Sequence, residues 1–166
     1  MYRCVIMMVC LLTVLLCGCS STDSLEMIND HFETVPVAAP AMIHLDFPEE
    51  DNVTVAQGDG WCTYTADAYE IVVQTCASGD LNRTLQQITG YNKERLTVME
   101  IPATNTNKYV CAWSTVSEEG EMVGRCTIID DGVYHYCLSV LIDADVAGDI
   151  REDIDTIFAT YSLESY

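Results

Sequence analysis

The sequence predicts an α+β domain: an antiparallel sheet of about six to seven strands, flanked by helices on both faces. Short β-rich runs separated by turn sequences predict the strands, and two segments carry a helical pattern. The last long run, residues 133–143, is apolar on both of its alternating faces. A strand of this kind needs cover on both sides, so the sequence favours an α–β–α sandwich.

The first elements along the domain are a hairpin and a helix. Residues 61–65 and 69–75 are β-rich and flank a short turn at 66–68. The first helix is expected to begin at Asp80, a good N-cap, and to end at Gly90, where a left-handed cap favours glycine. Its apolar face consists of Leu81, Leu85 and Ile88.

A strand over 96–101, ended by Pro102, precedes a three-stranded meander. The meander is expected over 108–116, 122–130 and 133–143, with turns at 117–120 and at Asp131-Gly132. A second helix then closes the chain. Its N-terminal end is rich in acids, which suits the helix dipole. Its apolar stripe consists of Ile150, Ile154, Ile157, Phe158 and Tyr161.

Composition limits the class of protein. The 166 residues have room for one ordinary domain, and 49% of them are hydrophobic, which excludes wholesale disorder. Seven basic side chains face 26 acidic ones, for a net charge of −19. So acidic a chain repels phosphate groups. We therefore expect no nucleic-acid partner and no electrostatic adhesion to anionic lipid.

The N-terminus has the layout of a secretory signal. Arg3 supplies positive charge, and residues 4–16 form an apolar run interrupted only by Thr13. The run is shorter than the roughly 20 apolar residues of a membrane-spanning helix. The sequence therefore predicts a signal peptide over residues 1–18.

The end of this segment, Leu16-Cys17-Gly18-Cys19, resembles the lipobox of bacterial lipoproteins. The resemblance implies cleavage between Gly18 and Cys19, and lipidation of the Cys19 thiol with further acylation by palmitate-type chains. It places the protein at the cell membrane, anchored by lipid on the extracytoplasmic face. Residues 19–40 then form a tether, which includes the proline-containing stretch 35–40, and residues 41–166 form the domain.

The closing part of the domain resembles the PsbP-like family of photosystem II extrinsic proteins. The residues that carry this resemblance are 131–136, Asp-Gly-Val-Tyr-His-Tyr, and the final helix with its aromatic-Ser-Leu tail, 154–163. The order of hairpin, helix, meander and C-terminal helix is also similar. The resemblance implies the PsbP-like α–β–α fold and an accessory or binding role, and it transfers no functional residue to this chain.

Five cysteines remain in the domain once the signal is removed and Cys19 is lipidated. If residues 116 and 121 pair across the first turn, Cys111 lies opposite Cys126. If residues 130 and 133 pair across the second turn, Cys126 also lies opposite Cys137, so the three cysteines form one row across three strands. A disulfide from Cys126 to either neighbour and three buried thiols are both compatible with this row. Because the outer two Cα atoms of a flat row lie about 10 Å apart, three thiolates do not converge on zinc, and we expect no metal.

Catalytic chemistry is not expected. His135 and Cys137 share a strand face but lie mid-strand in an apolar setting, where a cysteine is usually inert. The stretch 143–148 begins like a calcium loop but lacks oxygen ligands at Ala147 and Ile154. Trp113 is expected opposite Gly124, where it covers the glycine backbone. No catalytic residue, metal ligand or cofactor site is therefore assigned.

Together these features predict a surface lipoprotein with a non-catalytic, partner-binding domain. Its expected partners are the membrane, through lipid on Cys19, and a protein. Two alternatives stay open at this point: a hydrolase acting on envelope or extracellular polymer, and a sensor of small ligands or peptides.

Overall fold

The structure is a computed structural model, and it describes residues 38–48, 52–118 and 120–164. Gly18, Cys19, the signal peptide and all but the last three tether residues lie outside the described residues, so those predictions stay predictions. All the described residues belong to one compact unit, Ala38–Tyr166. No helix in the described part of the chain is long and apolar enough to cross a membrane.

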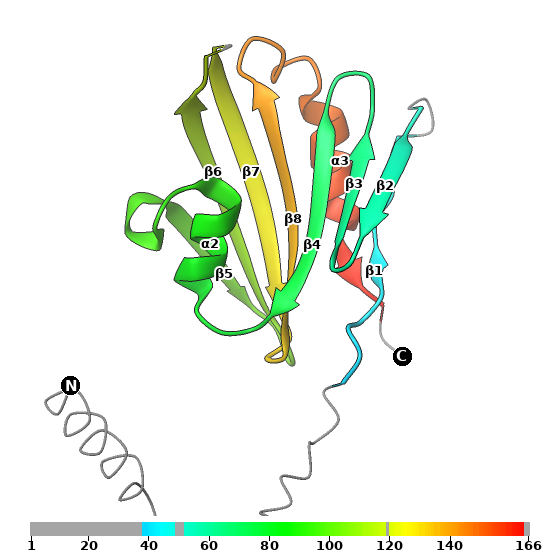
Figure 1. Cartoon of the computed structure of the whole chain (residues 1–166), viewed down its shortest axis with the longest axis vertical. Helices are drawn as coiled ribbons and strands as arrows, with labels where there is room; N and C mark the ends of the chain where they lie inside the picture. Colours follow the sequence, from blue (N-terminus) through cyan, green and yellow to red (C-terminus); the bar gives the residue numbers. More distant parts are fainter. Residues whose placement is uncertain (1–37, 49–51, 119, 165–166) are drawn as a thin grey trace, which may run out of the picture. The chain divides into compact units, whose positions relative to one another are not determined.

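The domain is built on a seven-stranded antiparallel sheet in the order β2-β3-β4-β8-β7-β6-β5 (Figure 1). Two helices and a short 3-10 turn, η1, accompany it in the described residues, and β1 pairs with β9 in a separate two-stranded ribbon. The element bounds are β1 Ile43–His44, β2 Thr54–Gly58, β3 Trp61–Thr65, β4 Glu70–Ala77, α2 Leu81–Thr89, η1 Lys93–Arg95, β5 Thr97–Pro102, β6 Asn107–Val116, β7 Glu121–Asp130, β8 Tyr134–Asp143, α3 Arg151–Thr160 and β9 Ser162–Leu163.

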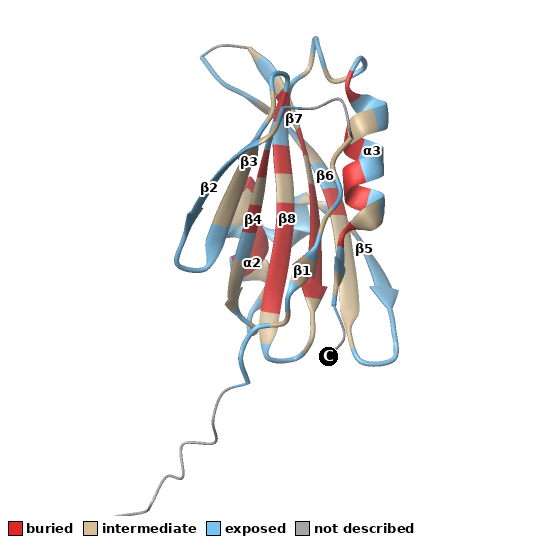
Figure 2. Cartoon of the chain, turned by 90° about the vertical axis from the view of Figure 1, so that its right-hand side faces the viewer, coloured by how far each residue is buried: buried red, intermediate tan, exposed pale blue. Residues whose placement is uncertain are grey.

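The core forms two clusters that follow the alternation of side chains along the central strand β8. Tyr136 and Leu138 are fully buried in a cluster that also contains the apolar stripe of α3. Figure 2 shows these buried residues along β8 and along α3. Cys137 points the other way, into a smaller cluster with Leu85 of α2. The stripe predicted for the second helix is confirmed, because all five of its residues are buried.

Helix α2 has the ends that its sequence predicts. The Asp80 carboxylate accepts a hydrogen bond from the backbone N–H of Asn82 at 3.0 Å. Gly90 ends the helix with φ at 78°, a left-handed conformation that costs glycine little. These ends limit α2 to nine residues.

The predicted register between β6 and β7 is confirmed. Cys111 lies opposite Cys126, and Trp113 lies opposite Gly124. A Cβ atom added at Gly124 would overlap the indole ring of Trp113, so the ring lies directly on the glycine backbone. This close approach explains why glycine occupies the position.

The predicted register between β7 and β8 is wrong by two residues. Asp130 pairs with His135, so the two-residue turn is Gly132-Val133 rather than Asp131-Gly132. The carboxylates of Asp130 and Asp131 accept hydrogen bonds from backbone N–H groups of the turn and hold it there. Gly132, with φ at 87°, occupies the position that requires positive φ.

Because of this shift, the predicted row of three cysteines does not form. Cys126 lies opposite Ser139, and Cys137 lies opposite Ile128. Cys111 and Cys126 remain directly opposed, whereas Cys137 is displaced along its strand.

Three further strands were not predicted. β2 adds an edge to the sheet beside β3, while β1 and β9 join the two ends of the domain. Pro102, expected to end a strand, is the last residue of β5. β5 is the other edge of the sheet, where a proline without an N–H is tolerated.

Candidate functional site

A groove runs beside α2 on the face of the sheet that carries Cys137. It consists of two adjoining pockets of about 300 and 400 Å³, which share Gln74, Gln87 and Ile88. The smaller pocket reaches Trp113 and Leu141, and the larger one reaches Trp61, Cys76 and Cys137. We call this surface the α2 groove.

The groove exists because α2 is too short to cover its face of the sheet. Leu85 covers Cys111, Cys126, Ile128 and Cys137, all of which are buried. Beyond the helix, Leu141 and Trp61 are 45% and 44% exposed. Apolar side chains in an open groove lose contact with water when a partner binds, which favours association.

The charge of the groove is one-sided. Among the described residues that line it, Asp59 and Glu70 are charged, and no lysine or arginine is present. The side-chain amides of Gln74 and Gln87 are hydrogen-bonding groups that can both donate and accept. The groove therefore suits a ligand with apolar and basic groups.

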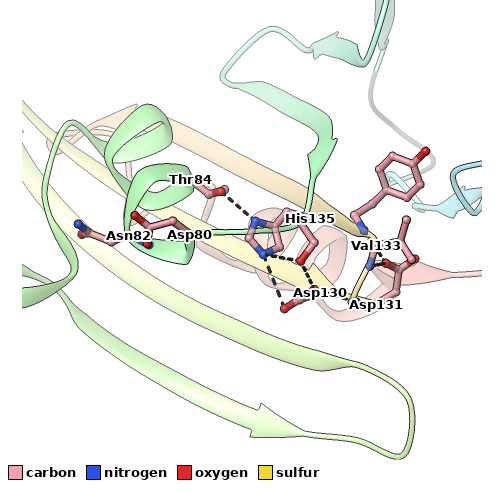
Figure 3. A network of polar contacts seen from close by, with 10 residues as sticks. Asp80, Asn82, Thr84, Asp130, Asp131, Val133 and His135 are labelled. Atoms are coloured by element: carbon pink, nitrogen blue, oxygen red, sulfur yellow. Dashed lines mark hydrogen bonds and ion pairs between the residues drawn. The ribbon is translucent and has the colours of Figure 1, made fainter. Parts of the chain in front are cut away.

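His135 lies at the centre of a polar network under α2 (Figure 3). It is only 1% exposed, and its Nδ1 shares a 2.8 Å hydrogen bond with the Thr84 hydroxyl. Its Nε2 lies 3.6 Å from the Asp130 carboxylate and 3.5 Å from the Ser78 hydroxyl, which donates to Asp130. Because an ionised carboxylate only accepts hydrogen bonds, the nitrogen that faces Asp130, Nε2, is the one that donates.

Cys76 on β4 lies directly opposite His135 and faces the larger pocket. A hydrogen bond from Cys137 lowers the pKa of the Cys76 thiol to about 6. This effect outweighs burial, and His135 and Thr84 add to it. The same pairing, together with burial, raises the pKa of Cys137. Cys76 is therefore a half-buried thiolate at neutral pH, and Cys137 is a buried thiol.

Cys111 and Cys126 form a second thiol pair under α2. Their sulfur atoms lie 2.7 Å apart, well inside the roughly 3.5–4.0 Å of ordinary contacts between non-bonded heavy atoms. A hydrogen bond from Cys126 lowers the pKa of Cys111, and the same interaction raises that of Cys126. Both side chains are buried, so this pair is shielded from solvent.

Comparison with solved structures identifies the fold. PsbP (CyanoP) of the cyanobacterium Synechocystis superposes with a TM-score of 0.53 at 8% sequence identity, and the match covers 78% of this chain and 96% of that protein. The fold is PsbP-like. No known family model matches the chain, and no curated protein is similar to it in sequence.

Two other solved structures are similar with a TM-score of 0.49. A Bacteroides thetaiotaomicron protein is 9% identical over 74% of this chain, which spans 45% of that protein's length. LpqN of Mycobacterium tuberculosis, a protein involved in cell envelope biogenesis, is 10% identical over 77% of this chain and 87% of its own.

The PsbP-like sheet brings together only part of the predicted set of cysteines. Cys111 and Cys126 meet as expected, but Cys137 lies beside Cys76, which the sequence analysis did not single out. β4 and β8 are separated by 56 residues of sequence, so no short turn fixes their register. Among the described residues, no group of three His, Cys, Asp or Glu side chains is arranged to hold a metal ion.

Proposed function

We propose that this protein is a lipid-anchored accessory module of the bacterial envelope that binds an extended segment of a protein partner in the α2 groove. The open groove beside the short helix carries the proposal. The PsbP-like fold supports a single-domain module but identifies no ligand, since function depends on the site rather than on the fold. The proposal includes the α–β–α arrangement, in which α2 and α3 cover opposite faces of the sheet.

The proposed location follows from the lipobox resemblance. Lipid on Cys19 would hold the domain at the extracytoplasmic face of the cell membrane, on a tether of about 20 residues. A single acyl chain binds membranes only marginally, whereas two or three give a stable anchor. The acidic domain would be repelled by anionic headgroups, which leaves the groove free for a partner.

The dimensions of the groove suit an extended chain. Trp61 on β3 and Trp113 on β6 are separated by four strand spacings across the sheet, roughly 19 Å, and by four residues along the strands, roughly 13 Å. An extended peptide rises about 3.3 Å per residue, so about seven residues span the resulting distance of roughly 23 Å. The exposed sheet face would take alternate apolar side chains, and Gln74 and Gln87 would bond to the peptide backbone.

Charge selects among such segments. The groove residues Asp59 and Glu70 and the net charge of −19 favour a segment that carries lysine or arginine. The proposed ligand is therefore an extended protein segment in which apolar and basic residues alternate. A neutral polysaccharide would gain little from this charge.

Site-specific photo-crosslinking in the producing cells tests the proposal. A photoreactive amino acid replaces the exposed Gln87 on the groove or, as a control, the exposed Glu152 on α3. The expected result is a protein adduct from position 87 alone. Peptide mapping of this adduct should place the crosslink in a basic, apolar segment of the partner.

A matched pair of substitutions then tests whether the groove itself is required. Leu141→Asp places a charge in the groove and should abolish the adduct. Val146→Asp changes a residue of similar exposure outside the groove and should leave the adduct intact. Equal adducts from positions 87 and 152, or an adduct that survives Leu141→Asp in the folded protein, would overturn the proposal.

A further inference from the structure

We propose that Cys76 and Cys137 are a redox-active dithiol that exchanges with disulfide compounds and closes into a reversible cross-strand disulfide. The substrate class is a disulfide, either a low-molecular-weight one such as oxidised glutathione or an exposed protein disulfide. This inference does not depend on the proposed partner-binding role.

The sheet register places the two thiols on adjacent strands and on the same face of the sheet. Cys76 pairs with His135 and Gln74 pairs with Cys137, so the two cysteines are diagonal neighbours on adjacent strands. Both line the larger pocket of the α2 groove, so the two side chains face the same space. Bond formation therefore requires no rearrangement of the strand order.

The two thiols differ in the way that exchange chemistry requires. Cys76 is half-buried and opens on the pocket, whereas Cys137 is only 2% exposed. His135 and the Thr84 hydroxyl lie beside Cys76 and stabilise its thiolate. Cys76 can therefore meet a disulfide from solution, and Cys137 can be reached only from inside the protein.

The reaction proceeds in two balanced steps. The Cys76 thiolate attacks one sulfur of the disulfide R–S–S–R, forms a mixed disulfide and releases one thiolate RS⁻. Cys137 then gives its proton to the released thiolate RS⁻, attacks the Cys76 sulfur and releases the second RS⁻. The two cysteines lose two electrons in total, and the disulfide R–S–S–R gains them and becomes one thiol RSH and one thiolate RS⁻.

The second thiol pair provides an internal comparison. Cys111 and Cys126 are directly opposed, where Cα atoms lie about 4.5–5.5 Å apart, within the range of unstrained disulfides. Diagonal neighbours lie roughly 7–8 Å apart, beyond that range. A disulfide between Cys76 and Cys137 therefore needs a local shift of the backbone, and it would be strained and more easily reduced.

The fifth cysteine of the domain cannot take part in this exchange in the folded state. Cys62 lies opposite Val73, on the other face of the sheet, and packs against the α3 cluster. The register therefore assigns one labile pair, one shielded pair and one separate thiol.

Redox titration of the full-length chain in detergent tests the inference. The protein is equilibrated with glutathione buffers from fully reduced to fully oxidised, quenched in acid and treated with N-ethylmaleimide, which blocks free thiols. Chymotrypsin cleaves after aromatic residues, and aromatic residues separate all five domain cysteines along the chain. Mass spectrometry of the digest then identifies each linkage directly.

We expect a peptide linking Cys76 to Cys137 to form as the buffer becomes oxidising and to disappear on reduction. Its midpoint should require a glutathione ratio at least about tenfold more oxidising than that of Cys111–Cys126. Cys137→Ser should leave Cys76 as a mixed disulfide with glutathione. Cys62→Ser should leave the titration unchanged.

Two results would overturn the inference. One is the recovery of Cys76 as the maleimide adduct at every glutathione ratio, from fully reduced to fully oxidised. The other is Cys76 linked to Cys62 or to another chain in the wild-type protein. Both are read on the unsubstituted chain, so neither depends on whether a variant folds.

Discussion

The hydroxyl group of Tyr136 joins the β7–β8 turn to the N-terminal segment of the domain. It donates a 2.9 Å hydrogen bond to the Asp131 carboxylate and accepts a 2.8 Å bond from the backbone N–H of Ala41. Asp131 also accepts bonds from the backbone N–H groups of Val133 and Tyr134. One buried side chain thus connects segments that are 95 residues apart.

Tyr136→Phe should lower the free energy of unfolding by about 1–2 kcal/mol, because it removes the hydrogen bonds between the hydroxyl and its half-buried partners, Ala41 and Asp131. The ring remains, so packing is unchanged. Urea unfolding measures the loss, and hydrogen exchange should show faster exchange of the Ala41 amide. Tyr91→Phe, which removes an exposed bond to the Ser114 carbonyl, should cost less. An equal loss in both variants would contradict the linking role.

Asp131→Asn should destabilise the protein at neutral pH by about 1 kcal/mol, and this difference should shrink in acid. Burial raises the pKa of Asp131, but hydrogen bonds from Tyr134, Val133 and Tyr136 outweigh it, and the net pKa lies below its usual value. The ionised form therefore stabilises the fold above the unfolded pKa of about 3.9, and this contribution is lost as pH falls through the folded pKa.

Urea unfolding of both proteins at a series of pH values measures this difference. If the gap between wild type and Asp131→Asn stayed constant down to the pH of acid unfolding, the carboxylate would not be the stabilising form.

Gly124→Ala should cost about 1–3 kcal/mol, because its Cβ would overlap the indole ring of Trp113 and force it to move. Thermal unfolding gives the loss of stability, and a change in tryptophan fluorescence reports the displaced ring. Gly79→Ala is the matched control, since a Cβ there meets no atom within 4 Å. Similar melting temperatures for the two variants would rule out the close packing.

Cys76 should react with iodoacetamide at a rate that rises through about pH 6, since only the thiolate attacks and the pKa is lowered to about 6. The groups that face it are Cys137 and His135 on β8 and Thr84 on α2. Peptide mapping after timed alkylation follows this one residue. In urea the midpoint should move toward the usual thiol value of about 8.5. The same midpoint in the folded and unfolded chain would show that the surroundings of Cys76 do not stabilise its thiolate.

Cys19→Ala should release the protein from the membrane or leave its precursor unprocessed, because Cys19 is the residue that we propose to be acylated and to become the first residue after cleavage. Incorporation of a labelled palmitate analogue and fractionation of the cells measure this. Cys17→Ala is the neighbouring control and should remain lipidated. A Cys19→Ala protein that is processed and still membrane-bound would contradict the anchor.

Local sequence signals predicted the parts of the fold that short turns and caps determine. Asp80 and Gly90 gave the ends of α2, and the turn at 117–120 gave the pairing of Cys111 with Cys126. The Gly132-Val133 turn shows the limit of this reasoning. Asp131-Gly132 is a favourable turn pair, but the carboxylates of Asp130 and Asp131 accept hydrogen bonds from the backbone, and the turn is shifted by one residue. Every cross-strand pair between β7 and β8 therefore differs from the predicted one.

The candidate site depended on contacts that no local pattern encodes. Cys76 meets Cys137 and His135 because β4 pairs with β8, although α2, η1 and three strands lie between β4 and β8 in the sequence. The α2 groove arises because a helix rises much less per residue than a strand, so the nine-residue α2 covers only part of the length of the ten-residue strands. Sequence periodicity indicates that a helix covers a sheet, but the uncovered area depends on where the helix lies.

The attachment of the N-terminal segment determines how the domain would respond to force. Tyr134 and Tyr136 hold Ala38 and Ala41, and both belong to β8, the middle strand of seven. β1 is paired with β9, next to the C-terminal end of α3. A pull on the chain ahead of residue 38, as a membrane tether would apply, therefore reaches the central strand and the closing ribbon before either sheet edge. Under tension, the small β1–β9 ribbon should yield first and leave the seven-stranded sheet intact.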